Sequence, residues 1–245
     1  MLKIQKLKKY FGGVRAVDGC SFNISEGKIT ALIGPNGSGK TTIFNLISGI
    51  LKANSGKILF NNKNITNKEA FEISNLGTSR LFQQARLFDN LTVRENLALA
   101  IEDEDTKFWK NLFRRNKLSE EKREKIRGIS ELVGISELQN NLGRNLSYGQ
   151  KRLVGIARAI LNYHTLLILD EPVAGVNPLL RKRIAEILIK LKEKGETILL
   201  IEHDMNFTLN LADNVIVLDQ GKVIAEGTPS RIKRDKKVLE AYLGE

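Results

Sequence analysis

The stretch "ALIGPNGSGKTTIF", residues 31–44, joins two apolar segments through a loop of glycines, a proline and a lysine. Within it, residues 34–41 fit the pattern G-x-x-x-x-G-K-[ST] without departure. In that pattern, the backbone N–H groups of a loop that follows a strand point inward at the phosphates of a nucleotide. Lys40 can then reach the β- and γ-phosphates, and the Thr41 hydroxyl can bind Mg²⁺. The helix that begins near Lys40 turns its positive end toward the anion.

The flanking residues supply the setting that this loop requires. "KITALI" before it is typical of a strand, and "TTIFNLIS" after it is typical of a helix. A glycine-rich turn without a ligand is the alternative interpretation, which the complete motif in this setting disfavours. Binding a nucleotide does not say how its energy is used, so the rest of the chain must answer that question.

The composition fits one large α/β domain, or one core with an inserted lobe. The chain has 245 residues, of which 42% are hydrophobic, so a sizeable core can form. Cys20 is the sole cysteine, which excludes a disulfide within the chain and fits a reducing compartment. The apolar runs "LLIL", "ILLI" and "VIVL" fall far short of the roughly 18 residues of a membrane-spanning helix, and they indicate buried parallel strands. We expect no signal peptide, because residues 1–13 lack a long apolar core.

The formal net charge of +11, from 39 Lys and Arg against 28 Asp and Glu, leaves three interpretations open. The basic residues are scattered, with denser groups in "FWKNLFRRNK", at residues 181–183 and at residues 231–237. A solvated surface is the simplest explanation, anionic lipid headgroups are the next, and nucleic acid is the third.

Turn signals and hydrophobic periodicity divide the chain into three parts. Residues 1–33 are typical of strands separated by turns, and "GKILFNNKNI" is typical of a hairpin with an Asn-Asn turn. Residues 89–145 change to a helical pattern rich in charge, with a capping box that opens at Thr92 and a further helix opened by Ser119. After about residue 152, strands and helices alternate, which predicts a parallel sheet with helices on both faces.

Polar residues end two of the later apolar strands. Asp170 and Glu171 close "LLILDE", and His203 follows "ILLIE". Because ligands of α/β sheets bind at the carboxyl ends of the strands, we predict that Asp170 holds Mg²⁺ and that Glu171 orients and deprotonates an attacking water. His203 is placed to hydrogen-bond the γ-phosphate or that water. His164, the other histidine, has no such setting, and we predict that it lies on the surface.

A second helix start that can bind an anion lies in "NLSYGQKRLVGIARAIL", where Ser147, Tyr148 and Gly149 precede a helical pattern. One copy of the chain offers this start no nucleotide of its own. A head-to-tail pair of copies resolves the difficulty, because residues 147–149 of each copy would close on the nucleotide that the Lys40 loop of the other copy holds.

Five motifs, in this order, make nearly the whole chain resemble the ATP-binding subunit of an ABC transporter. "GPNGSGKTT" resembles the Walker A motif, "LFQQARLF" the Q-loop, "LSYGQ" the ABC signature, "LLILDE" Walker B and "IEHD" the switch-histidine loop. The signature between Walker A and Walker B separates this family from other P-loop ATPases.

The resemblance implies ATP and Mg²⁺ as ligands, with Phe11 stacked on adenine, or Tyr10 as the alternative. The residues implied to bind nucleotide are Phe11, Val17, Gly34, Asn36, Gly37, Ser38, Gly39, Lys40, Thr41, Thr42, Ser147, Gly149 and Gln150. Those implied to act in hydrolysis are Glu171, His203 and Gln83, and those implied to hold Mg²⁺ are Thr41, Gln83 and Asp170. Gln83 would also couple the site to a membrane partner.

The same resemblance implies the architecture. It predicts an α/β fold, a P-loop NTPase (RecA-like) core with a mostly parallel sheet, an N-terminal antiparallel β subdomain and an inserted α-helical subdomain. We expect one ATPase domain, with the core at residues 1–88 and 152–230, the helical subdomain with the signature at 89–151, and a C-terminal helix at 231–245.

Two departures from the family pattern point to a subgroup. Tyr148 stands in the signature where glycine is commonest, and Asn177 stands in "AGVNP" where many members carry aspartate. Both variants, together with "FGGVRAV" and "LTVRENL", resemble the ATPase of branched-chain amino acid importers. ATPases for urea, and for lipopolysaccharide or lipid export, share parts of the pattern.

The resemblance implies an ATP-driven motor that pairs with itself or with a paralogue. It would dock on membrane permease subunits at the inner, cytoplasmic face of the cell membrane, and no nucleic acid is expected. The alternative is a soluble ABC-type ATPase that acts on nucleic acid or ribosomes, but such proteins usually carry two cassettes or a long coiled-coil insertion, and this chain has neither. A regulator without turnover is disfavoured because Glu171 and His203 are both in place.

Overall fold

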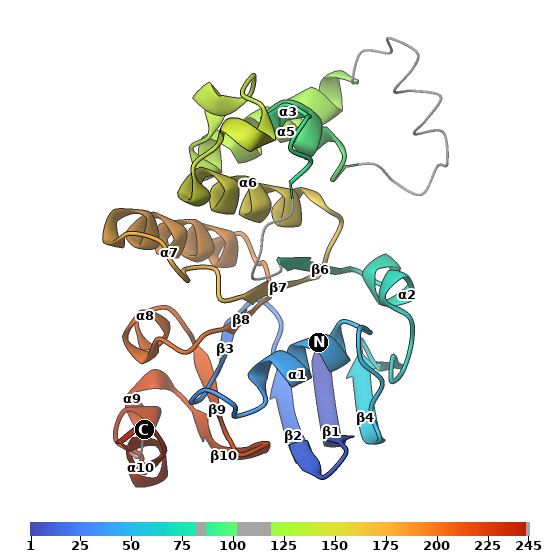
Figure 1. The fold of residues 1–245 in the computed structure, drawn as a ribbon, viewed down its shortest axis with the longest axis vertical. Coiled ribbons are helices and arrows are strands. Elements are labelled where there is room, and N and C mark those ends of the chain that lie inside the picture. Colours follow the sequence, from blue (N-terminus) through green and yellow to red (C-terminus); the bar gives the residue numbers. More distant parts are fainter. Residues whose placement is uncertain (82–86, 102–118, 244–245) are drawn as a thin grey trace. The chain divides into compact units, whose positions relative to one another are not determined.

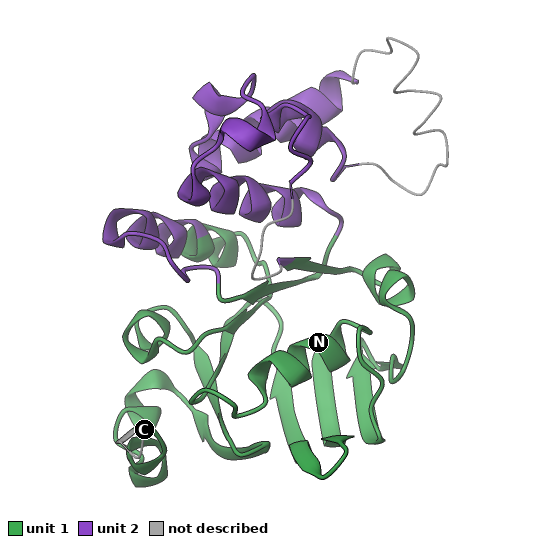
Figure 2. Cartoon of the chain, viewed as in Figure 1, with its two compact units in different colours: residues 1–80, 164–171, 188–245 green, residues 81–163, 172–187 purple. Residues whose placement is uncertain are grey.

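A computed structural model describes residues 1–81, 87–101 and 119–243 of the chain (Figure 1). The chain divides into two compact units (Figure 2). Unit 1 comprises Met1–Arg80, His164–Glu171 and Leu188–Glu245, and unit 2 comprises Leu81–Tyr163 and Pro172–Ile187. The basic group "FWKNLFRRNK", residues 108–117, lies outside the described residues.

The predicted N-terminal antiparallel sheet is confirmed in unit 1, with the strand order β2-β1-β4-β5. Its strands are β1 (Leu2–Phe11), β2 (Val14–Ile24), β4 (Ser55–Phe60) and β5 (Lys63–Asn64). The Asn-Asn hairpin is also confirmed. Asn61 and Asn62 have φ values of 49° and 63°, which are the positive values that a type I′ turn requires at both central positions.

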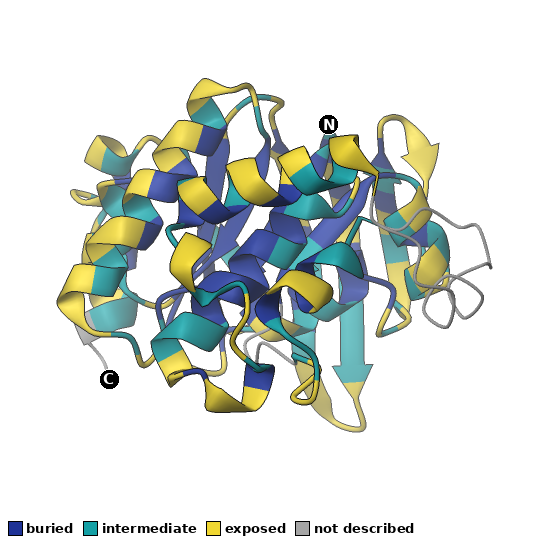
Figure 3. Cartoon of the chain, turned by 90° about the horizontal axis from the view of Figure 1, so that it is seen from above, coloured by how far each residue is buried: buried dark blue, intermediate teal, exposed yellow. Residues whose placement is uncertain are grey.

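The main sheet has the order β10-β9-β3-β8-β7-β6. Its strands are β3 (Ile29–Ile33), β6 (Thr78–Leu81), β7 (Leu166–Asp170), β8 (Ile198–Ile201), β9 (Asn214–Asp219) and β10 (Lys222–Gly227). Strands β7, β8, β3 and β9 pair in parallel, and β10 adds an antiparallel edge. Every residue of β3, β7 and β8 is buried, as sheets covered on both faces require, and Figure 3 shows buried residues concentrated in the strands.

Short helices complete unit 1. They are α1 (Lys40–Ile47), α2 (Ala70–Asn75), α8 (Met205–Leu209), α9 (Pro229–Ile232) and α10 (Lys236–Leu243). Helix α7 (Pro178–Glu193) begins in unit 2 and ends in unit 1. The single C-terminal helix expected at 231–245 is instead two helices, α9 and α10. The Asp235 carboxylate accepts a hydrogen bond from the Lys237 backbone N–H at 2.9 Å, so a new helix starts there.

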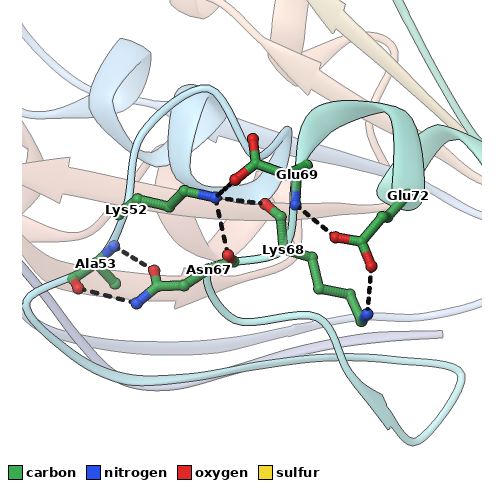
Figure 4. A network of polar contacts seen from close by, with 6 residues as sticks. All are labelled: Lys52, Ala53, Asn67, Lys68, Glu69 and Glu72. Atoms are coloured by element: carbon green, nitrogen blue, oxygen red, sulfur yellow. Dashed lines mark hydrogen bonds and ion pairs between the residues drawn. The ribbon is translucent and has the colours of Figure 1, made fainter.

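A polar network ties the segment after α1 to the start of α2 (Figure 4). Lys52 Nζ donates hydrogen bonds to the backbone oxygens of Asn67 and Lys68 and to the Glu69 carboxylate. Asn67, with φ of 59°, accepts from the Ala53 backbone N–H and donates to the Ala53 oxygen. These bonds hold residues 52–53 and 67–69 together, and neither of these two segments belongs to a helix or a strand.

Unit 2 contains α3 (Val93–Ala98), α5 (Glu120–Val133) and α6 (Tyr148–Leu161). The predicted helix starts are confirmed, since Thr92 caps α3 with a complete capping box and Ser119 caps α5. Helix α6 packs on α3 and α5, so the compact unit extends past the boundary expected at residue 151. In the described parts of the chain, no helix has both the length and the apolar character needed to cross a bilayer.

Candidate active site

The phosphate loop connects β3 to α1, as the sequence predicts. Lys40 folds into this loop and is only 7% exposed. Its Nζ atom donates hydrogen bonds to the backbone oxygens of Gly34 at 2.7 Å and Pro35 at 2.8 Å. Because an ammonium group has donors and no acceptor, these carbonyls orient it without cancelling its charge. The loop therefore holds a cation where phosphate charge can be compensated.

Backbone contacts hold the loop in shape from two sides. Gly39 caps α1 with φ of 103°, and a Cβ atom there would lie 2.4 Å from the Ala16 oxygen of β2. Only glycine permits both that conformation and that close approach. On another side, the Gly221 N–H donates to the Ser38 oxygen at 3.0 Å. The loop thus keeps its shape through rigid backbone rather than through mobile side chains.

The register of the main sheet aligns three strand ends. Asp170 of β7 pairs with Ile201 of β8, and Ile201 pairs with Leu32 of β3. Because these strands are parallel, their carboxyl ends meet at one edge of the sheet, where ligands of α/β folds bind. The phosphate loop, Glu171 and His203 each follow one of these ends.

Glu171 and His203 are brought together at this edge. His203 Nδ1 lies 3.4 Å from Glu171 Oε1, and the histidine side chain is 51% exposed whereas that of the glutamate is 20% exposed. Glu171 has φ of 45°, which is uncommon for a residue with a side chain. Its backbone N–H donates to the Ile201 oxygen at 2.9 Å, which holds this strained conformation. The pair offers a carboxylate to accept a proton and an exposed imidazole beside it.

Sequence reasoning missed Glu202. This residue is fully buried, and its Oε2 atom lies 3.9 Å from Nδ1 of His203. The sequence did carry a signal for Glu202, because this residue stands directly between an apolar strand and His203. A carboxylate at such a position is rarely buried unless it has a partner. His203 is therefore flanked by two carboxylates, Glu171 and Glu202.

The residues predicted for adenine differ in exposure. Phe11 is 46% exposed, with Lys9 Nζ 5.0 Å from its ring centre. Tyr10, the alternative, donates its hydroxyl to Asp18 at 2.8 Å. Val17 is fully buried in the core cluster, so it supports the hairpin from within and offers no surface to a base. Phe11 is the most exposed of these three residues.

The signature residues form the start of α6 in unit 2. Ser147 and Gln150 make a reciprocal capping box, in which Ser147 Oγ accepts from the Gln150 N–H at 3.3 Å and Gln150 Oε1 accepts from the Ser147 N–H at 2.9 Å. Gly149 presents backbone without a side chain in the first turn. The positive end of this 14-residue helix therefore lies at residues 147–149, which are the residues predicted to bind an anion.

Thr41 and Asp170 are the described residues predicted to hold Mg²⁺. Asp170 is buried at the end of β7, and Thr41 is exposed in the first turn of α1. Their hydroxyl and carboxylate oxygens are the hard donors that Mg²⁺ prefers, and this ion usually takes one or two protein oxygens and completes its shell with phosphate and water. Such a site fits a chain whose described residues contain no cluster of three or more His, Cys, Asp or Glu. Gln83 lies outside the described residues.

The prediction that His164 is a surface residue is wrong. Its side chain is 5% exposed, and its Nε2 atom lies 3.2 Å from Glu196 Oε2. This contact with His164 holds the pKa of the Glu196 carboxyl below its usual range. His164 and Glu196 precede β7 and β8, so the pair lies at the amino ends of these strands, away from Glu171.

A loop built for phosphate, with a glutamate and a histidine facing each other at the ends of parallel strands, defines a class of protein. Proteins of this class are P-loop ATPases, which bind a nucleotide and hydrolyse it. More particularly, the family model described as "ABC transporter" matches residues 17–174, and the chain belongs to this family of ATP-hydrolysing cassettes. A model described as "Branched-chain amino acid ATP-binding cassette transporter" matches residues 222–245.

Known proteins resemble the chain over all or nearly all of its length. The "Probable branched-chain amino acid transport ATP-binding protein LivG" of Archaeoglobus fulgidus is 41% identical over 245 residues, which cover 100% of this chain and 95% of that protein. The crystal structure of the ADP conformation of an ATP-binding cassette of an ABC transporter is 39% identical, has a TM-score of 0.87, and is matched over 100% of this chain and 99% of that chain. The dimeric structure of a bacterial ABC transporter cassette is 27% identical with a TM-score of 0.80, over 94% of this chain and 99% of that chain. The predicted α/β cassette fold and ATPase class are confirmed.

Proposed function

We propose that this ATPase forms an ATP-bridged dimer that drives a membrane permease for branched-chain amino acids. The substrate class is supported by the full-length similarity to a probable branched-chain amino acid transport ATP-binding protein. It is also supported by the match of residues 222–245 to the branched-chain amino acid cassette model. The dimer is supported by the dimeric structure of a related cassette. The chain would then lie peripherally at the cytoplasmic face of the membrane, held there by its permease.

The observation that carries the proposal is the Glu171–His203 pair at the carboxyl edge of the main sheet. The phosphates of ATP would lie on the backbone of residues 34–42 with Lys40 against the β- and γ-phosphates. Bound Mg²⁺, held by Thr41 and Asp170, would supply charge neutralisation on the phosphate oxygens.

Glu171 would act on the attacking water. Its carboxylate can orient the water and accept its proton, and this function needs a group that is near the phosphates and partly exposed. His203 can donate from its exposed imidazole to the γ-phosphate, so loss of that phosphate removes a contact on which the closed dimer depends. Gln83, which follows β6, would report the state of the site to the permease.

The second copy would complete the site. Ser147 and Gly149 lie at the N-terminus of α6 in unit 2, and the anion that this helix start binds would be the nucleotide held by another copy. Gln150 would contribute by holding the cap through its bond to the Ser147 N–H. Binding two nucleotides between two copies favours the closed pair by mass action.

The first experiment measures ATP binding and hydrolysis in Glu171→Gln. We expect ATP affinity to persist while kcat falls roughly 10²-fold or more, the scale of a general base. Glu196→Gln is the matched control, because it makes the same chemical change at the opposite end of the strands. Steady-state hydrolysis at the parent rate in Glu171→Gln would remove this residue from the role.

The second experiment tests the shared site and the partner. Ser147→Arg is expected to block hydrolysis without weakening ATP binding to a monomer, and full-rate hydrolysis by a monomer would contradict the paired site. Purification from membranes should bring down apolar permease subunits. Salt-sensitive nucleic acid in their place would favour an ATPase that acts on nucleic acid.

A further inference from the structure

Helix α6 is fastened at two points to the loop that follows Glu171, residues 172–177, here called the post-glutamate loop. The Tyr148 hydroxyl donates a hydrogen bond to the backbone oxygen of residue 174 at 3.1 Å. Arg152 Nε donates to the backbone oxygen of residue 172 at 2.9 Å. Tyr148 and Arg152 are four residues apart on one helix, so they project from the same face and reach alternate carbonyls of the loop.

The ring of Tyr148 also packs on this loop. Gly175 has φ of 70°, and a Cβ atom there would lie 3.4 Å from Tyr148 Cε1 and 3.5 Å from its hydroxyl oxygen. The end of the loop is held as well, since Asn177 Oδ1 accepts from the Leu180 N–H at 2.8 Å. A Cβ atom on Gly149 would lie 2.7 Å from Leu180 Cδ2, which shows how closely the first turns of α6 and α7 approach.

The loop is joined directly to the proposed general base. Glu171 is the last residue of its segment of unit 1, and Pro172 begins the next segment of unit 2. The strained φ of Glu171, 45°, stands at this junction. The post-glutamate loop is therefore separated from Glu171 by one peptide bond.

We propose that Tyr148 is a positioning residue for hydrolysis, whose hydroxyl and ring hold the post-glutamate loop on the signature end of α6 and so aim the Glu171 carboxylate. The proposal rests on the role of Glu171 in the proposed function. A positioning role would explain why the signature of this chain carries a tyrosine at position 148, where glycine is commonest. Tyr148 is 56% exposed, so its hydroxyl contributes little to stability, whereas Arg152 is 2% exposed and its loss would leave buried polar groups unsatisfied.

The test is Tyr148→Phe in the full chain, a change that removes the hydroxyl and keeps the ring. We expect kcat to fall roughly 3- to 10-fold, as for loss of one neutral hydrogen bond expressed in the transition state. KM for MgATP should stay within about 2-fold, because the hydroxyl that is removed is bonded to the post-glutamate loop of the same chain. Tyr148→Ala, which also removes the ring packing on Gly175, should lower kcat further.

Two measurements separate positioning from stability and from binding. The melting temperature of Tyr148→Phe should equal that of the parent, and ATP-driven dimerisation should be unchanged when the substitution is made in the Glu171→Gln background. Tyr163→Phe is the matched control, because Tyr163 is an exposed tyrosine just beyond the other end of α6 and should leave kcat unchanged.

Three outcomes would overturn the inference. They are an unchanged kcat in Tyr148→Phe, an equal loss of kcat in Tyr163→Phe, and a weakened ATP-driven dimer that accounts for the lower rate. Glu171→Gln tells the two proposals apart. Full hydrolysis by Glu171→Gln overturns the role of the glutamate and this inference with it, whereas an inactive Glu171→Gln beside a fully active Tyr148→Phe overturns the inference alone.

Discussion

We expect the substitutions His164→Gln and His203→Gln to separate the stability of this protein from its catalysis. The chain has two histidines, and each lies beside a glutamate at one end of the same two strands. The His164–Glu196 pair precedes β7 and β8, and the Glu171–His203 pair follows them. The two substitutions thus make one chemical change at opposite edges of one sheet.

The expected sizes follow from burial. A hydrogen bond to a charged group contributes about 1.5–3 kcal/mol to stability, which is an upper value for the 3.2 Å contact between His164 and Glu196. The 30% exposure of the Glu196 side chain lowers the expected loss in His164→Gln to about 1–2 kcal/mol. For a chain of this length, that loss lowers Tm by roughly 2–8 °C. His203 is half-exposed, so its pair contributes less than about 1 kcal/mol. Replacing its imidazole donor to the γ-phosphate by an amide of different shape and position should nevertheless lower kcat roughly 10²-fold.

The assays are thermal unfolding followed by circular dichroism without nucleotide, and phosphate release at saturating MgATP. His164→Gln should melt early and hydrolyse ATP at the parent rate at a temperature well below its Tm. His203→Gln should melt with the parent and hydrolyse slowly. The reasoning fails if His203→Gln keeps the parent kcat, or if His164→Gln loses activity in the folded state.

Three further predictions concern single contacts. Because the pKa of Glu196 is lowered in the folded state, its contribution to stability is complete above the ordinary glutamate pKa and is lost as the pH falls through the lower folded value. The difference in Tm between the parent and Glu196→Gln should therefore be largest near pH 7 and should shrink as the pH falls below roughly 4.3. A difference in Tm that persists unchanged at lower pH contradicts this prediction. Asn67→Gly keeps the positive φ but loses both bonds to Ala53, so urea unfolding should show a loss of about 1–2 kcal/mol, and Asn67→Ala should lose about 1 kcal/mol more through backbone strain; equal stability of the two variants would argue against the strain. Burial raises the pKa of the Cys20 thiol to about 11, so a thiol reagent at neutral pH should label it only after denaturation, and rapid labelling of the folded chain would contradict its burial.

The elements that could be predicted depend on neighbours along the chain. The type I′ turn at Asn61 and Asn62 and the caps at Thr92, Ser119 and Ser147 each involve bonds within about four residues, and the structure confirms them. The closing segment was predicted as one helix, but the hydrogen bond that the Asp235 carboxylate accepts from the Lys237 N–H starts a second helix there.

The sequence by itself determined the phosphate loop, the strand-end position of Glu171 and His203, and the cap of α6, because loop geometry, strand direction and capping follow from short-range chemistry. The tertiary structure decided which groups face each other. That His164 is buried against Glu196, and that the Tyr148 hydroxyl reaches the loop after Glu171, depends on segments distant in the chain being folded side by side. No local pattern encodes such pairings, because they are set by the register of parallel strands and by the packing of α6, which the whole fold must satisfy at once.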